Sequence, residues 1–148
     1  METRELKVLI FSINDEYYAA DIMEVERILG YQEPTELSDS PSFVEGVINY
    51  HGTILPIISL SKRFGFEEGE IKKDSKIVVA KQENNKIGII VDVVSEVSDV
   101  NVKNMEEAPE IVAGISKRYI QGLIKIEGKI IIFLNLSTIL TDEEKKMI

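Results

Sequence analysis

A hairpin pattern bounded by glycines occurs twice in the chain, and it constrains the fold more than any other feature of the sequence. The first copy occupies residues 46–60 and the second occupies residues 122–136. In each copy two short apolar runs flank a glycine, Gly52 or Gly128, and glycine supplies the backbone freedom that a tight reversal needs. The copies keep one register 76 positions apart (122 − 46), with glycine, isoleucine and leucine at matching places. The pattern predicts two strand–turn–strand units related by an internal duplication.

Coincidence is the alternative explanation of this match, because any two buried hairpins share glycine turns and isoleucine-rich strands. Within the first copy, Pro56 cannot donate to a hydrogen-bond ladder and is therefore expected at a sheet edge or a bulge. Directly after it, residues 61–64 are expected to form a short helix with Ser61 as its N-cap.

Two further hairpins precede the glycine hairpins. One joins residues 6–13 to residues 17–22, and the other joins residues 76–80 to residues 87–94, each across a turn of Asn, Asp or Glu. Between the first pair of hairpins, the apolar positions from Ile22 to Leu29 fit either one face of a helix or a twisted strand with a bulge.

The order of these segments predicts a mainly β protein with a few short helices. Short strands at this spacing favour two small β subdomains, and closing each into a barrel removes most of the exposed sheet edges. The chain of 148 residues has the length of one domain. We expect a charged internal connector near residues 65–75 and a frayed charged tail over residues 141–148.

Composition narrows the possible partners and compartments. A net charge of −9 argues against nucleic acid and anionic membrane surfaces, since both require a basic footprint. The chain has no cysteine, which excludes a disulfide framework and thiolate metal ligands. With no recognisable signal peptide and no apolar run long enough to span a bilayer, a cytoplasmic protein is expected.

The sequence lacks the residue sets that catalysis requires. Its single histidine, His51, lies beside Gly52 and is expected to be an exposed turn residue rather than a catalytic group. No nucleophile elbow, phosphate-binding loop or dinucleotide fingerprint is present. Asp21, Asp92 and Asp99 are isolated carboxylates without the spacing of a calcium loop, and Asp21 and Asp92, in apolar strands, are expected to be structural. We therefore expect no enzyme activity, no cofactor and no metal site.

Apolar side chains near the N-terminus leave a functional alternative open. Leu9, Ile22, Val25 and Ile28 are numerous for a subdomain this small. Most of them can be assigned to the core. The alternative is a groove between the subdomains that takes an apolar partner helix.

Three stretches of the chain together resemble the CheW-like chemotaxis coupling proteins. The most specific is Phe-Val-Glu-Gly-Val-Ile-Asn at residues 43–49, followed by Gly52 and by Ile-Leu-Pro-Ile-Ile at residues 54–58; residues 87–94 and residues 17–30 also match. The similarity runs from about residue 6 to residue 140. It implies two interleaved, five-stranded SH3-like β-barrels, in which strands near the termini cross between the halves.

The resemblance also implies a function and its partners. Such proteins tie the histidine kinase CheA to chemoreceptors, so the expected partners are the regulatory domain of that kinase and the cytoplasmic tip of methyl-accepting receptors. The free protein is expected to be a monomer in the cytoplasm, recruited to the membrane through receptors. By resemblance, Leu9, Ile22, Val25 and Ile28 occupy the receptor-binding groove. The repeated hairpin pattern itself marks Gly46, Gly122 and Gly128 as structural turn residues.

The chain departs from the family pattern at two places. The family motif Asn-Leu-Arg-Gly is associated with signalling, and here it reads Asn49, Tyr50, His51 and Gly52. Histidine has a shorter reach than arginine and is mostly neutral at neutral pH. Ser59 replaces an acid common in the family. His51 motivates one alternative, a related adaptor of a chemosensory system that does not control motility. A second alternative, from a different class, is a β-barrel sensor of a small ligand, which needs a concave site with a few convergent polar groups.

Overall fold

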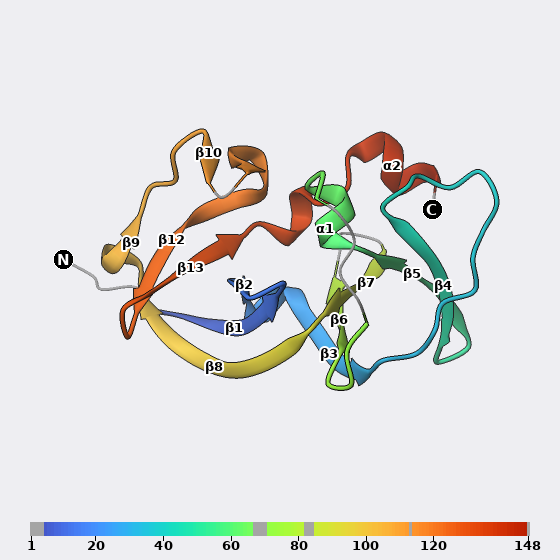
Figure 1. Cartoon of the computed structure of the whole chain (residues 1–148), viewed down its shortest axis with the longest axis horizontal. Coiled ribbons are helices and arrows are strands. Elements are labelled where there is room, and N and C mark those ends of the chain that lie inside the picture. Colours follow the sequence, from blue (N-terminus) through green and yellow to red (C-terminus); the bar gives the residue numbers. More distant parts are fainter. Residues whose placement is uncertain (1–4, 67–70, 82–84, 113, 148) are drawn as a thin grey trace.

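Two β-sheets organise the chain in the computed structural model, which describes residues 5–66, 71–81, 85–112 and 114–147 (Figure 1). Sheet A has the strand order β8 (Val93–Asn101), β1 (Glu5–Ile13), β2 (Glu16–Asp21), β13 (Lys129–Leu134), β12 (Ile120–Ile126) and β9 (Met105–Glu106). Sheet B has the order β3 (Val25–Gly30), β6 (Lys76–Lys81), β7 (Lys86–Val91), β5 (Thr53–Ile58) and β4 (Val44–Tyr50). Strands β10 (Ile111–Val112) and β11 (Ile115–Ser116) form a separate small hairpin.

Helices are few and short. The α-helices are α1 (Leu60–Arg63) and α2 (Asp142–Met147), and the 3-10 turns are η1 (Ile22–Glu24), η2 (Val102–Asn104), η3 (Lys117–Tyr119) and η4 (Leu136–Thr138). The mainly β prediction is confirmed. In Figure 1 the two sheets form two lobes, and α2 lies over the lobe of sheet B although it follows β13 of sheet A.

The two sheets are interleaved in a reciprocal way. The hairpin β1–β2 belongs to sheet A, but the next strand, β3, pairs with β6 of sheet B. Conversely, β6–β7 belongs to sheet B, but the next strand, β8, pairs with β1 of sheet A. Each glycine hairpin then joins its sheet through a parallel contact, β5 with β7 and β13 with β2. The expected exchange of strands between the halves is therefore confirmed.

The strand registers show that the duplicated sequence pattern reflects a structural repeat. In β4 the pairing shifts between Val44 and Gly46, and in β12 it shifts between Ile120 and Gly122, 76 positions later. The turns also match, since Gly52 and Gly128 have φ angles of 80° and 77°. Gly46 and Gly122 were expected at turns, but they lie inside strands, directly after β-bulges.

Side chains of the central strands alternate between two apolar cores. Val8 and Ile10 of β1 pack into a cluster inside sheet A, whereas Leu9 and Phe11 point into a large cluster that both sheets share. Strand β6 repeats this arrangement, with alternate residues in the shared cluster and in a third cluster inside sheet B. Because both faces of these strands are buried, their sequences are continuous apolar runs instead of alternating ones.

Pro56 does not lie on an edge strand or at a bulge, contrary to the prediction. It lies in β5, between β4 and β7, and opposite Val47. The backbone N–H and C=O of Val47 both bond to Thr35, so the Val47–Pro56 pair exchanges no ladder bonds. The nitrogen of Pro56 therefore faces the β7 side, where pairing begins only at Ile57. The missing N–H costs no sheet hydrogen bond at this place.

Local predictions between the hairpins met mixed outcomes. Residues 25–30 form a strand with a register shift at Val25, which selects the bulged-strand interpretation over the helix. The cap of α1 is Ser59, not Ser61, because the Ser59 hydroxyl accepts the Lys62 N–H at 3.3 Å. Ser59 stands where an acid is common in the family. Serine and aspartate are both favoured N-cap residues, so this replacement is compatible with capping α1. The predicted connector near residues 65–75 and the turn at residues 83–85 lie partly outside the described residues.

The segment expected to be a frayed tail instead carries α2 and is anchored. Glu144 accepts the Thr141 backbone N–H at 2.8 Å while its own N–H donates to the Thr141 hydroxyl at 3.1 Å, a capping box that the sequence Thr-Asp-Glu-Glu contains. Both Glu144 oxygens also accept from the Arg63 guanidinium, at 2.7 and 3.0 Å. Arg63 further donates to the Ile139 carbonyl and stacks 4.4 Å from the centre of the Phe43 ring.

We expect Glu144→Gln to loosen α2 without unfolding the sheets. Although burial alone raises the pKa of Glu144, the Thr141 N–H and the Arg63 guanidinium bring it below its ordinary value. The amide keeps an acceptor for the cap but loses the charge-assisted pair, which is worth about 1–3 kcal/mol. Hydrogen exchange should show faster exchange in α2, whereas Glu143→Gln, at an exposed neighbour, should leave it unchanged. Equal exchange rates in both variants would contradict the anchoring role of Arg63.

Candidate docking surfaces

The edge strands of the two sheets carry apolar side chains on the face toward the shared core. Paired residues of adjacent strands present their side chains on one face of the sheet. Val25 and Ile28 of β3 pair with Ala80 and Val78, which lie in the shared cluster. Val94 and Val97 of β8 pair with Phe11 and Leu9 of the same cluster. We call the set Ile22, Val25, Ile28, Val94 and Val97 the apolar strip.

The structure contradicts the prediction for one of the groove residues, Leu9. Leu9 is 2% exposed and lies in the shared core, because β1 is an inner strand between β8 and β2. It can support a docking surface from below but cannot touch a partner. Ile22 and Val25 are half-buried against that core, and Ile28 is 41% exposed. Sequence reasoning missed Val94 and Val97, although the equivalence of β8 with β3 in the repeat points to them.

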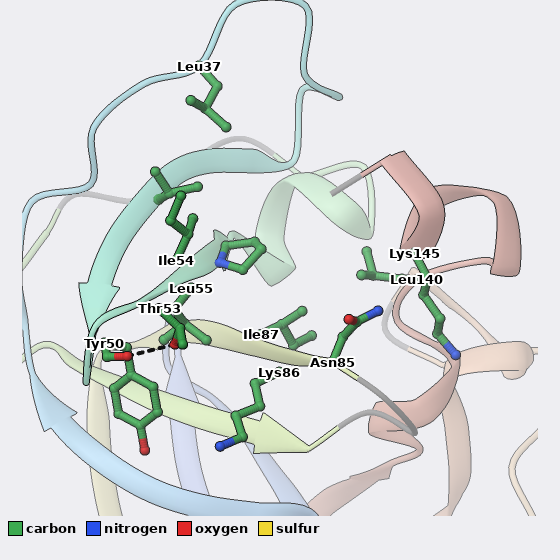
Figure 2. Close-up of a pocket in the computed structure, with 12 residues that line it drawn as sticks. Leu37, Tyr50, Thr53, Ile54, Leu55, Asn85, Lys86, Ile87, Leu140 and Lys145 are labelled. Carbon is green, nitrogen blue, oxygen red and sulfur yellow. Dashed lines mark hydrogen bonds between the residues drawn. The ribbon is translucent and has the colours of Figure 1, made fainter.

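A second apolar surface surrounds a cavity of about 550 Å³ beside the β4–β5 hairpin. Figure 2 shows Leu37 above the hairpin, Ile54 on it, and Leu140 and Lys145 reaching the same space from the C-terminal segment. Ile54 is 75% exposed and Leu37 is 49% exposed. We call Leu37, Tyr50, Thr53, Ile54 and Leu140 the hairpin patch. The sequence marked Ile54 only as a strand residue and gave no signal for Leu37.

The predicted signalling motif forms the turn of this hairpin. The Asn49 side chain accepts the Gly52 N–H at 3.1 Å, and the Thr53 hydroxyl donates to the Tyr50 carbonyl at 2.7 Å. His51 has a φ of 50° and is exposed, as expected for a turn residue. Asn49 and Gly52 therefore build the turn, and His51 is the motif residue whose side chain projects from it.

Side chains of the two outermost strands of sheet B contact each other. Strands β3 and β4 are the first and last strands of the sheet. The Tyr50 hydroxyl nevertheless donates to Glu26 of β3 at 2.6 Å, and Arg27 Nη1 lies 2.9 Å from Nε2 of His51. Lys86 pairs with the second Glu26 oxygen at 2.9 Å. The hydrogen bonds from Tyr50 and Lys86 lower the pKa of Glu26. Side chains of the first and last strands of sheet B therefore lie within hydrogen-bond distance of each other, although the two strands share no backbone ladder.

The isolated carboxylates have structural roles. Asp21 caps η1 by accepting the Met23 N–H at 3.0 Å, Asp92 accepts the Asn14 N–H at 2.8 Å, and Asp99 pairs with Lys7 at 2.9 Å. Within the described ranges no three acidic or histidine side chains are close enough to hold a metal ion. No helix in the described part of the chain has the length and apolar character needed to cross a membrane.

Glu24 is partly buried between η1 and η4, in surroundings that disfavour its charge. It joins η1 to η4 by accepting the backbone N–H groups of Leu136 and Ser137, yet its Oε1 is buried without a hydrogen-bond partner among the described residues. Burial, and to a lesser extent the charge of Asp21, raise the pKa of Glu24 above its ordinary 4.5. The folded chain therefore holds this proton more tightly than the unfolded chain does.

This raised pKa predicts a pH-dependent gain from Glu24→Gln. The stability that protonation of Glu24 contributes is fully present below pH 4.5 and is lost as pH rises through the raised folded-state pKa. The amide has no such titration, so the free energy of unfolding of the variant should improve relative to wild type as pH rises from 4.5. Urea unfolding at several pH values between 4.5 and 7.5 measures this difference. A difference independent of pH would show that Glu24 does not titrate in this window.

Comparisons with known proteins agree over nearly the whole chain. Residues 7–144 match the CheW-like domain family. The chain is 30% identical over 147 residues to the chemotaxis protein CheW of Klebsiella aerogenes, covering 99% of this chain and 89% of that protein. It is 32% identical over 139 residues to the chemotaxis protein CheW of Thermotoga maritima, covering 94% and 90%. The crystal structure of the scaffolding protein TtCheW from Thermoanaerobacter tengcongensis superposes with a TM-score of 0.87 at 31% identity, covering 97% and 92%.

Fold, repeat and comparisons therefore give one answer about the class of protein. The chain is an interleaved, two-sheet domain that presents apolar surfaces on separate elements. It belongs to the CheW-like family of chemotaxis scaffold proteins.

Proposed function

We propose that this protein is a non-catalytic adaptor that couples transmembrane chemoreceptors to a CheA histidine kinase. It acts in the cytoplasm and reaches the membrane through the receptors. The observation that carries the proposal is that a CheW-like chain presents two apolar surfaces, the strip and the hairpin patch, which share no residue. A coupling protein needs two separate surfaces, whereas an enzyme needs reactive groups that converge on one site.

The apolar strip is the proposed receptor surface. Its aliphatic side chains suit the apolar face of a helix, such as a receptor's cytoplasmic hairpin tip presents. Each Å² of apolar surface removed from water contributes about 25 cal/mol before the costs of association. The half-buried members of the strip pack on the shared core, so little side-chain freedom remains to be lost on binding.

The hairpin patch is the proposed kinase surface. Ile54 has a structural counterpart in the second copy of the repeat, Ile130, which is 55% exposed. A kinase regulatory domain that is itself homologous to this chain can pack against either hairpin by related contacts. Pseudo-symmetric packing of this kind extends an assembly in which this protein alternates with the kinase domain.

Sedimentation of purified components tests the proposal. The chain alone is expected to be a monomer, to bind a CheA regulatory domain and a receptor-tip fragment separately, and to form a ternary complex with both. Simultaneous binding follows from the separate surfaces. Mutual exclusion of the two partners, or no complex with either, would contradict the coupling role.

Two other functions keep specific support. His51, in place of the family arginine, favours a related adaptor in a chemosensory system that does not control motility. Isolation of the chain with receptors of that system would establish it. The cavity beside Ile54 has the size of a small-ligand site, which favours a ligand sensor. A thermal-shift screen that raises the melting temperature of wild type but not of Ile54→Arg would support that function.

A further inference from the structure

The C-terminal segment crosses from one lobe to the other, and there it borders the cavity of the hairpin patch. Residues 135–147 follow β13 of sheet A, yet α2 lies over the lobe of sheet B (Figure 1). Leu140 and Lys145 of this segment line the cavity together with residues of β4, β5 and β7 (Figure 2). The cavity is therefore bounded on one side by sheet B and on another by a segment that arrives from sheet A.

Arg63 holds this segment in place through three hydrogen bonds. Its Nε donates to the Ile139 carbonyl at 2.7 Å, and its two Nη atoms donate to the carboxylate of Glu144, at 2.7 and 3.0 Å. Leu140 lies between these two contacts in the sequence, and Lys145 follows Glu144 directly. The side chains of Arg63 and Glu144 are only 11% and 20% exposed, so solvent weakens this ion pair less than it weakens a surface pair. The cavity-lining residues of the segment are therefore fixed from one anchor point.

Arg63 is itself fixed by aromatic rings from both lobes. Its guanidinium carbon lies 4.4 Å from the ring centre of Phe43, directly before β4, and 5.6 Å from that of Tyr119, directly before β12. The ring of Phe64, the next residue, lies 5.2 Å from that of Tyr119 and 6.3 Å from that of Tyr18 in β2. The first glycine hairpin thus continues toward sheet A, while the second continues toward sheet B. Arg63 lies where these two crossing segments meet.

We propose that Arg63 and Glu144 are positioning residues of the kinase-facing surface. They hold the C-terminal segment as a second wall of the cavity, and a side chain of the kinase regulatory domain binds between this wall and Ile54. This inference rests on the proposed function. Because most lining residues are apolar, the fitting occupant is an aliphatic side chain, of the kind that this fold exposes at Ile130 on its second hairpin. A wall that is fixed before binding lowers the ordering cost of association and so tightens the complex.

A pair of substitutions in α2 tests whether the wall takes part in binding. Glu144→Gln removes the charge of the anchor, whereas Glu143→Gln makes the same change at an exposed neighbour. Calorimetry with a kinase regulatory domain should show an affinity lowered about three- to tenfold by Glu144→Gln and unchanged by Glu143→Gln. Receptor-tip binding should stay within about twofold of wild type for both variants, which also shows that the fold is intact. An unchanged or higher kinase affinity in Glu144→Gln would overturn the inference, since the segment would then lie outside the binding surface or cover it.

A double-mutant cycle with Ile54 distinguishes a wall from a general loss of stability. If one partner side chain touches both walls, Glu144→Gln should weaken kinase binding by less than about twofold in an Ile54→Ala background. A general loss of stability would instead lower the affinity by the same factor in both backgrounds, and that result would overturn the positioning role.

Methyl NMR spectroscopy of the free protein separates this inference from the proposed function. The methyl signals of Leu140 should shift in Glu144→Gln and in Arg63→Lys and stay in place in Glu143→Gln, because only the first two variants change the anchor. Unshifted signals in those two variants would overturn the positioning role. Shifted signals together with no kinase binding by wild type would contradict the kinase function alone and leave Arg63 and Glu144 as the residues that shape the cavity.

Discussion

Gly46→Ala is expected to cost about 3–5 kcal/mol of folding stability, a large part of what a small domain has. Gly46 has a φ of 143°, a conformation that side chains with a Cβ rarely adopt. An added Cβ would also collide with the carbonyl oxygen of Thr35. That oxygen cannot move away freely, because it accepts the Val47 N–H at 2.9 Å in the bridge that covers the outer edge of β4.

Gly30→Ala is the matched control for this variant. Gly30 ends β3 in the same sheet, its φ is not positive, and no atom lies within 4 Å of the place that an alanine methyl group would take. Its replacement should change the free energy of unfolding by less than about 1 kcal/mol. Urea unfolding of the two variants beside wild type gives the comparison. Similar midpoints for Gly46→Ala and wild type would mean that the bulge relaxes without penalty and that its glycine is dispensable.

The repeat was predictable because it depends on the spacing of glycines and apolar residues within each short segment. Turn residues and short apolar runs identified the four hairpins, and the structure gives both glycine hairpins the same register. The destinations of β3 and β8 could not be read from their residues, since strand pairing is decided by contacts far away in the sequence. Only the resemblance to a family with interleaved strands supplied that exchange.

The docking residues show the same division between local and distant information. The sequence shows that Leu9 is an apolar residue in a strand, but it does not show that both faces of this strand, β1, are buried. Arg27 gave no signal, because its contact with His51 joins elements at opposite ends of sheet B. Helix α2 differs from these residues because its signal is local. The capping box from Thr141 to Glu144 is present in the sequence, but the prediction of a frayed tail considered only the charge of the segment.

Val25→Asp is expected to weaken receptor-tip binding about 100-fold, which corresponds to about 3 kcal/mol. Val25 lies in the middle of the apolar strip, on the face of β3 that its partner Ala80 also faces. A carboxylate there would lose its water when a helix covers the strip, and burying a charge in an apolar contact is costly. Binding of the kinase regulatory domain should stay within about threefold of wild type, because the hairpin patch contains no residue of β3.

Ile54→Asp gives the reciprocal case and turns the prediction into a double dissociation. Ile54 is 75% exposed on the hairpin patch, so its replacement should leave the fold and receptor binding intact while lowering kinase-domain affinity at least tenfold. Because Val25 is half-buried, Ile28→Asp, at a position 41% exposed, repeats the receptor test with less risk to the core. Calorimetry of each variant with each partner separates the surfaces. If either substitution weakened both partners equally while the melting temperature stayed unchanged, the two contacts would belong to one surface and the adaptor would bind its partners one at a time.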